Sequence, residues 1–146
     1  MKALIPFVLV VGSSSLGVAR SVTAKEPSRG ELIAGCVESR EKSFECKDPF
    51  IDAMIDLRLS RSGKTVTTEE REKMKAQGIA EITEDGSGPL PPRRAKCAAL
   101  VDQMTSAGRS IRPSIHADLK ACYKKTDCRQ RVHCMMPLFA ELMFGK

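Results

Sequence analysis

Six cysteines are the residues of this 146-residue sequence with the clearest chemistry. In an oxidising compartment they pair as disulfides, and elsewhere cysteines more often ligate metal or act as nucleophiles. Their number is even, and no C-x-x-C pair occurs, which argues against both a thioredoxin-like redox enzyme and the common zinc spacings. We therefore expect three disulfides and no metal, from Cys36, Cys46, Cys97, Cys122, Cys128 and Cys134.

The pairing of these cysteines follows from where the expected helices turn. Cys36 and Cys46 bracket the first expected helix-to-helix turn, so we expect them to pair. For the other four we favour the first of three pairings, and the other two stay open. The three are Cys122–Cys128 with Cys97–Cys134, Cys97–Cys122 with Cys128–Cys134, and Cys97–Cys128 with Cys122–Cys134.

Candidate catalytic groups are few. Nucleophilic catalysis needs a nucleophile and a base within hydrogen-bond reach, and the only histidines are His116 and His133. His133 and Cys134 are adjacent on one expected helix, so their side chains diverge. Methionines near the C-terminus suit cuprous copper, but they fall on an apolar helical stripe typical of a core. We expect a non-enzyme, with no catalytic residues and no cofactor.

The first 24 residues have the pattern of a secretory signal peptide. Lys2 precedes an apolar run over residues 3–11, and Val22-Thr23-Ala24 is a small-residue cleavage pattern. The run is shorter than the ~20 residues that a membrane-spanning helix needs. We expect residues 1–24 to be cleaved, no transmembrane span, and export to the periplasm or the medium, between which the sequence does not decide.

The mature chain has helical periodicity nearly throughout. Ile51 and Ile55 lie one turn apart on an apolar face, and no strand-like alternation occurs. Thr67 and Glu70 have the spacing of a capping box, and Asp127 is placed to cap the last helix. The sequence therefore predicts an all-α, disulfide-stabilised domain of about five to six short helices.

A change of composition and charge divides the mature chain. Residues 85–92, Asp-Gly-Ser-Gly-Pro-Leu-Pro-Pro, predict a linker between helical parts over 25–84 and 93–146. Residues 25–85 hold 11 Lys and Arg and 14 Asp and Glu, for a net charge of −3. Residues 86–146 hold 11 Lys and Arg and 4 Asp and Glu, for a net charge of +7. The C-terminal part is thus basic and rich in cysteine.

An antiparallel arrangement of the last three helices would gather eight of these cations at one pole. We expect this pole to bind anions: an anionic envelope surface, an acidic polysaccharide or an acidic protein. Few aromatic residues lie near these cations, which argues against nucleic acid. The alternative is that the basic part simply packs against the acidic part. The eight cations are Arg93, Arg94, Lys96, Lys120, Lys124, Lys125, Arg129 and Arg131.

These observations favour an exported binding or envelope-structure module with a basic anion-binding pole. A second hypothesis is a helical carrier of an apolar ligand, because the last helix is rich in methionine, which lines adaptable pockets. A third is a secreted effector or enzyme of unrecognised type. A cavity of roughly several hundred Å³ between the helices would favour the carrier. A solid core would favour the surface binder.

Overall fold

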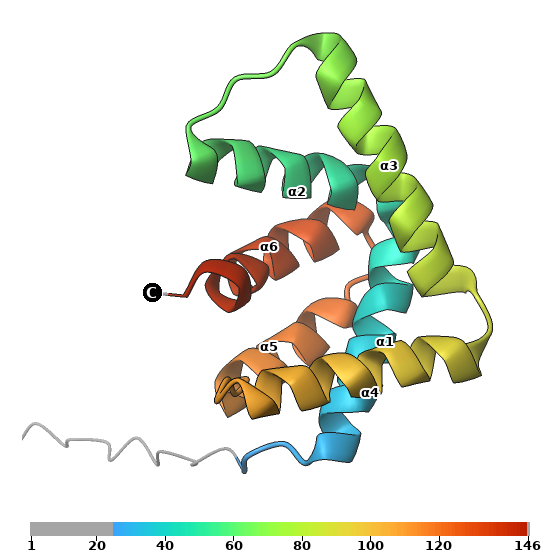
Figure 1. The fold of residues 1–146 in the computed structure, drawn as a ribbon, viewed down its shortest axis with the longest axis vertical. Helices are drawn as coiled ribbons and strands as arrows, with labels where there is room; N and C mark the ends of the chain where they lie inside the picture. Colours follow the sequence, from blue (N-terminus) through green and yellow to red (C-terminus); the bar gives the residue numbers. More distant parts are fainter. Residues whose placement is uncertain (1–24, 146) are drawn as a thin grey trace, which may run out of the picture.

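The fold consists of α-helices alone within the part of the chain that the structure, a computed structural model, describes, residues 25–145. The predicted all-α class is therefore confirmed. The predicted signal peptide lies outside the described residues. Among the described helices, none combines the length and the apolar character needed to cross a membrane. The helices are α1 (Arg29–Glu45), α2 (Lys47–Ser62), α3 (Thr68–Ser87), α4 (Leu90–Ser106), α5 (Pro113–Tyr123) and α6 (Cys128–Phe144) (Figure 1).

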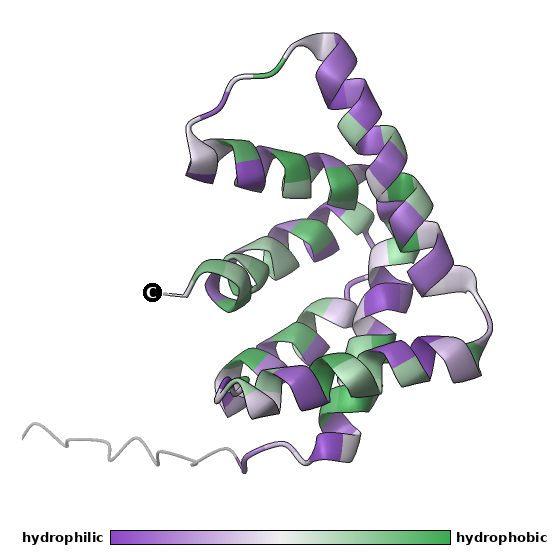
Figure 2. Ribbon diagram, viewed as in Figure 1, coloured by the Kyte–Doolittle hydropathy of each residue, from purple (hydrophilic) through white to green (hydrophobic). Residues whose placement is uncertain are grey.

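Two helices form a spine from which the other four extend. α1 packs against α3, α4 and α5, while α2 packs against α3 and α6, and α5 packs against α6. In Figure 1, α2, α6 and α5 extend to the same side of α1 and α3, while α4 crosses α1. Hydrophobic residues run along α2, α5 and α6, whereas α3 is mostly hydrophilic (Figure 2).

The helix starts follow ordinary capping chemistry. The Thr67 hydroxyl accepts a hydrogen bond from Glu70 N at 3.2 Å, and the Glu70 carboxylate accepts one from Thr67 N at 2.7 Å. The Asp127 carboxylate accepts a hydrogen bond from Gln130 N at 2.8 Å at the start of α6. These bonds satisfy backbone donors that the first turn of a helix leaves free. Both predicted caps are confirmed.

The segment predicted as a linker is mostly helical. Residues 85–87 end α3 and residues 90–92 begin α4, so only Gly88 and Pro89 lie between the two helices. Proline is tolerated in the first turn of a helix, where its missing N–H is not needed. A Cβ atom on the buried Gly86 would lie 2.3 Å from Cβ of Phe44 and 2.8 Å from the carbonyl oxygen of Arg40. Gly86 therefore serves the close approach of α3 to α1 and is not part of a flexible connection.

The core joins both predicted parts of the chain. A small cluster lies between α1 and α4 and consists of Ile33, Val37, Cys97 and Val101. The larger cluster draws on helices from both parts, so neither part has a core of its own. Its buried members are Cys46, Phe50, Ile51, Ile55, Ile82, Ile115, Leu119, Cys122, Tyr123, Val132 and Met135.

Three disulfides pair all six cysteines, as expected, but mostly not in the expected combinations. The bonds are Cys36–Cys97, Cys46–Cys128 and Cys122–Cys134. Of the predicted pairs only Cys122–Cys134, from the third alternative, is confirmed. The pairs found wrong are Cys36–Cys46, Cys122–Cys128, Cys97–Cys134, Cys97–Cys122, Cys128–Cys134 and Cys97–Cys128.

The error in the first pair has a geometric cause. Cys36 lies within α1, and Cys46 is the residue that directly follows it, so the two are separated by most of one straight helix. Ten residues of α-helix span about 15 Å, whereas a disulfide needs Cα atoms about 4.4–6.8 Å apart. Cys36 instead meets Cys97 on α4, with a Cα–Cα distance of 5.8 Å.

Candidate functional site

An open groove of about 1310 Å³ lies among the helices. All six helices contribute to its lining. Phe50 and Ile55 come from α2, Ile82 from α3, and Phe139 and Leu142 from α6. The Phe50 and Phe139 rings meet edge to face at 5.7 Å between centroids, which closes the side of the groove between α2 and α6. The wall is therefore mainly apolar.

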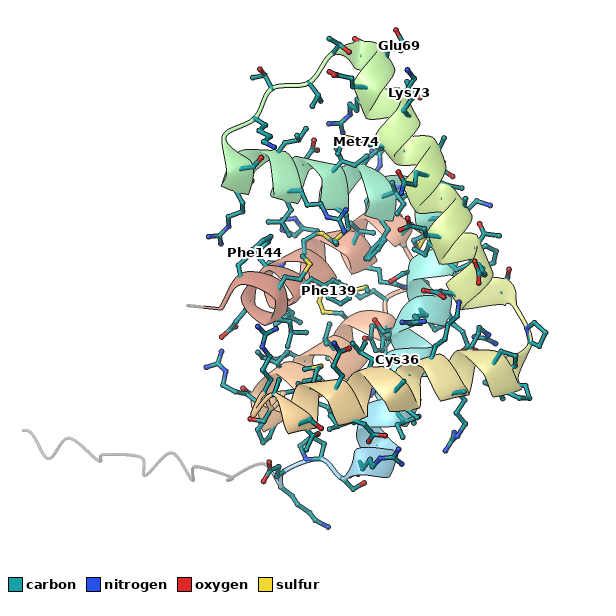
Figure 3. All side chains as sticks on the ribbon, viewed as in Figure 1. Cys36, Glu69, Lys73, Met74, Phe139 and Phe144 are labelled. Atoms are coloured by element: carbon teal, nitrogen blue, oxygen red, sulfur yellow. A yellow bond between two sulfur atoms is a disulfide. The ribbon has the colours of Figure 1, made fainter. Side chains whose placement is uncertain are left out.

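Four methionines line this groove, and each comes from a different helix. They are Met54 on α2, Met74 on α3, Met104 on α4 and Met143 on α6. The first three are half-buried and Met143 is 41% exposed. Figure 3 shows Met74 on the length of α3 that faces α2. Because methionine is flexible and polarisable, such a wall adapts to apolar molecules of different shape.

One end of the groove is built where three helices meet. The Arg61 guanidinium near the end of α2 lies 5.3 Å from the centroid of the Phe144 ring at the end of α6. Arg112, just before α5, forms an ion pair with Glu141 in the last turns of α6. Phe144 remains 45% exposed despite its contact with Arg61 (Figure 3). We call this region the arginine end of the groove and define it by Arg58, Arg109 and Arg112, all of which line the groove.

Polar groups of the groove wall lie mainly on α1, α3 and α5. Nη1 of Arg40 lies 3.1 Å from Oδ2 of Asp85, but it is buried without a well-aligned hydrogen bond to any described residue. The His116 ring packs against α1, where a Cβ on Gly35 would lie 3.0 Å from its Cε1 atom. Burial lowers the pKa of His116, and the nearby charge of Lys120 lowers it further. The imidazole is therefore neutral at pH 7.

Three of the eight cations predicted to bind anions pair with acidic residues of the N-terminal part instead. The side chain of Arg93 bonds Glu41 at 2.9 Å and the carbonyl oxygen of Gly88 at 2.6 Å. Lys96 donates to Glu84 at 2.8 Å and to Asp85 at 3.2 Å. Arg93 meets Glu41 because α4 packs mainly on α1 and not as an antiparallel hairpin with α5, whereas Lys96 reaches the end of α3.

Arg131, the third of these cations, is only 6% exposed. Its guanidinium donates to the carbonyl oxygen of Lys125 at 2.8 Å and to the Glu45 carboxylate at 2.5 Å. The pKa of Glu45 is lowered by its hydrogen bond from Lys42 and further by Arg131. Arg131 thus holds the end of α1 to the start of α6 and is not available to a ligand.

The remaining five predicted cations are exposed and form no ion pair within residues 25–145. Lys124, Lys125 and Arg129 lie in or beside the turn between α5 and α6, whereas Arg94 lies in the first turns of α4. Lys120 lines the groove from α5. Anion binding by this set stays a prediction.

Sequence reasoning missed most of the groove. It singled out the methionines of the last helix, of which Met143 lines the groove but Met135 is fully buried in the core. Met54 and Met74 carry the same signal, because each lies on an apolar stripe of an otherwise polar helix. The convergence of these stripes depends on how α2 and α3 cross, which the sequence pattern alone does not give.

The described part of the chain can also be compared with the requirements of a metal site and of a free thiol. Within residues 25–145, no three His, Cys, Asp or Glu side chains gather as metal ligands, and each cysteine is in a disulfide. Comparison with known proteins gives no match to a protein-family model, a curated protein or a solved structure.

Proposed function

We propose that this protein is an exported binding protein that holds an apolar molecule in the groove. The observation that carries the proposal is the size and lining of the groove: about 1310 Å³, with apolar side chains from all six helices. Ligand pockets for small molecules usually measure about 300–1,000 Å³ and are lined mainly by apolar groups. A hollow of this size supports the carrier hypothesis over a protein that binds only through its outer surface.

The disulfides support the proposal because they resist collapse of the groove. Apolar walls facing water tend to close on one another, since burial of apolar surface is favourable by about 25 cal/mol per Å². Cys36–Cys97 fixes α4 to α1, and Cys122–Cys134 fixes α5 to α6. These bonds hold the frame of the groove at set distances, so that a ligand can fill it. Three disulfides also fit a protein that works outside the cytoplasm.

The basic-pole hypothesis is less well supported than the groove. Three of its eight cations, Arg93, Lys96 and Arg131, pair with carboxylates of the same chain. Of the five that remain, Lys124, Lys125 and Arg129 lie at the turn between α5 and α6, whereas Arg94 lies on α4 and Lys120 on α5. Exposed cations are expected on a protein of net charge +6 and do not by themselves indicate a binding site.

Fluorescence of an apolar dye, N-phenyl-1-naphthylamine, tests the proposal on the mature protein, residues 25–146. We expect saturable binding with one dye site per chain. Leu100→Glu places a charge on an exposed position of the groove wall and should weaken binding strongly. Leu90→Glu is the matched control, because Leu90 is 51% exposed and does not line the groove. Absence of saturable binding, or equal loss in both variants, would overturn the proposal.

A further inference from the structure

The charged groups that line the groove are unevenly paired. Of the three acidic ones, Asp85 faces Arg40 and Glu141 pairs with Arg112, whereas Glu81 accepts a hydrogen bond at 3.0 Å from the neutral amide of Gln77. Among the lining cations, no described carboxylate pairs with Arg58, Arg109 or Lys120. The groove therefore offers a ligand three cations without a described carboxylate partner, against one carboxylate, that of Glu81, without a described cationic partner. Its charged lining residues are Arg40, Arg58, Glu81, Asp85, Arg109, Arg112, Lys120 and Glu141.

Two of the unpaired cations lie at the arginine end. Arg58 lies one turn before Arg61 on α2, so the two are neighbours on the helix surface, and Arg61 reaches Phe144. Arg109 lies three residues before Arg112, which pairs with Glu141. Arg58 and Arg109 both line the groove, and their near neighbours in sequence, Arg61 and Arg112, contact the last turns of α6. The apolar wall begins directly beside them, at Phe144 and Met143, which also line the groove.

We infer that the ligand is a long-chain fatty acid whose carboxylate binds at the arginine end while its alkyl chain lies along the methionine wall. This inference rests on the proposed function. A fatty acid has one charged head at one end of an apolar chain, and the groove has its unpaired arginines at one end of an apolar wall. Arginine presents a planar fork of donors that matches a carboxylate, and such charge-assisted bonds are stronger than neutral ones.

The alkyl chain of the fatty acid contributes most of the binding affinity, and its carboxylate head group contributes the selectivity. Each buried CH₂ group contributes about 0.8 kcal/mol, irrespective of the head group. A fatty alcohol of the same length keeps the contribution of the buried CH₂ groups, but its hydroxyl is only a neutral hydrogen-bond partner for Arg58 and Arg109. An alkylammonium ion of the same length places positive charge beside three arginines and is repelled. Selectivity among the three compounds therefore reports on the unpaired cations of the groove, and substitution of Arg58 and Arg109 separates the arginine end from Lys120.

Displacement of bound N-phenyl-1-naphthylamine by palmitate, hexadecanol and hexadecyltrimethylammonium, each below its aggregation threshold, tests the inference. Palmitate should displace the dye at a concentration lower by about tenfold or more than hexadecanol, because a hydrogen bond to a charged group contributes more than a neutral one. The ammonium compound should be weakest. In Arg58→Glu/Arg109→Glu the advantage of palmitate over hexadecanol should vanish.

Matched variants separate the inferred site from net charge. Arg94→Glu/Arg129→Glu changes the net charge equally at exposed positions outside the groove and should keep the selectivity. Arg58→Gln/Arg109→Gln, checked for an unchanged circular dichroism spectrum, should lose it as well. Equal displacement by palmitate and hexadecanol would overturn the inference and leave the proposed function standing. No dye binding, or a dimer that buries the groove in size-exclusion chromatography, would overturn both.

Discussion

Removal of the Cys46–Cys128 disulfide should destabilise the protein more than removal of Cys122–Cys134. The first bond closes a sequence separation of 82 residues and the second one of 12. The chain-entropy relation gives about 4.5 kcal/mol for the longer loop and about 2.8 kcal/mol for the shorter one. The Cys36–Cys97 bond already shortens the longer loop to roughly 40 residues, which still gives about 3.9 kcal/mol. A difference of about 1 kcal/mol or more in the free energy of unfolding is therefore expected.

Urea denaturation of Cys46→Ala/Cys128→Ala and Cys122→Ala/Cys134→Ala measures this difference. The two variants are matched, because each removes one fully buried and one half-buried sulfur. Both free energies are compared with that of the unaltered mature protein, with the slope of each transition fitted separately. Equal losses, or a larger loss in the Cys122 variant, would refute the reasoning from loop length. Each variant can also be cut by a protease between α2 and α3, where Cys36–Cys97 still joins the two fragments; their separation without reductant would refute that pairing.

Two further substitutions test packing and titration at named positions. Gly86→Ala should lower the free energy of unfolding by about 1–3 kcal/mol, because its Cβ would meet Phe44 and the α1 backbone. Gly30→Ala, the control, should not lower the free energy of unfolding. Equal effects of the two substitutions in urea denaturation would contradict the close approach of α3 to α1. The pKa of His116 is lowered in the folded protein, so the unfolded chain takes up the proton first, and stability should fall as the pH falls below about 6.5. His116→Gln should make the melting temperature depend less on pH between pH 7 and pH 5. An unchanged pH dependence would mean that groups other than His116 cause it.

Local signals predicted the helices well because those signals act within one turn. The capping box of Thr67 and Glu70 and the cap at Asp127 need only neighbouring residues, and both form as expected. The apolar stripe of α2 is likewise local, and Ile51 and Ile55 are buried in the core. Helix content and the starts of α3 and α6 could therefore be predicted from the sequence, whereas the start of α4 could not.

The segment around Gly86 was harder to interpret because its composition fits two structures. Glycine is common where the chain must bend and also where two helices must approach closely. Here Gly86 is buried against Phe44, a contact between residues more than 40 positions apart. Most of the predicted disulfide pairs are wrong for a similar reason: Cys36 lies beside Cys97 only because α1 packs on α4.

The candidate site depends still more on tertiary arrangement. The charge contrast between the two parts was visible in the sequence, but the side chains that neutralise Arg93, Lys96 and Arg131 were not. The methionines of the groove come from four helices, and their convergence follows from helix crossing. The methionine content of the sequence suggested the carrier hypothesis, and the groove indicates where such a ligand would bind.

Intermolecular nuclear Overhauser effects to methionine methyl groups test the central claim, ligand binding in the groove, most directly. The mature protein has six methionines, and ¹³C-methyl labelling resolves each of them in the presence of palmitate. The groove predicts contacts to Met54, Met74, Met104 and Met143. Met135 and Met136 do not line the groove and serve as internal controls. Effects on the four lining methyls alone would support the account, whereas effects on none of them, or chiefly on the two controls, would contradict it.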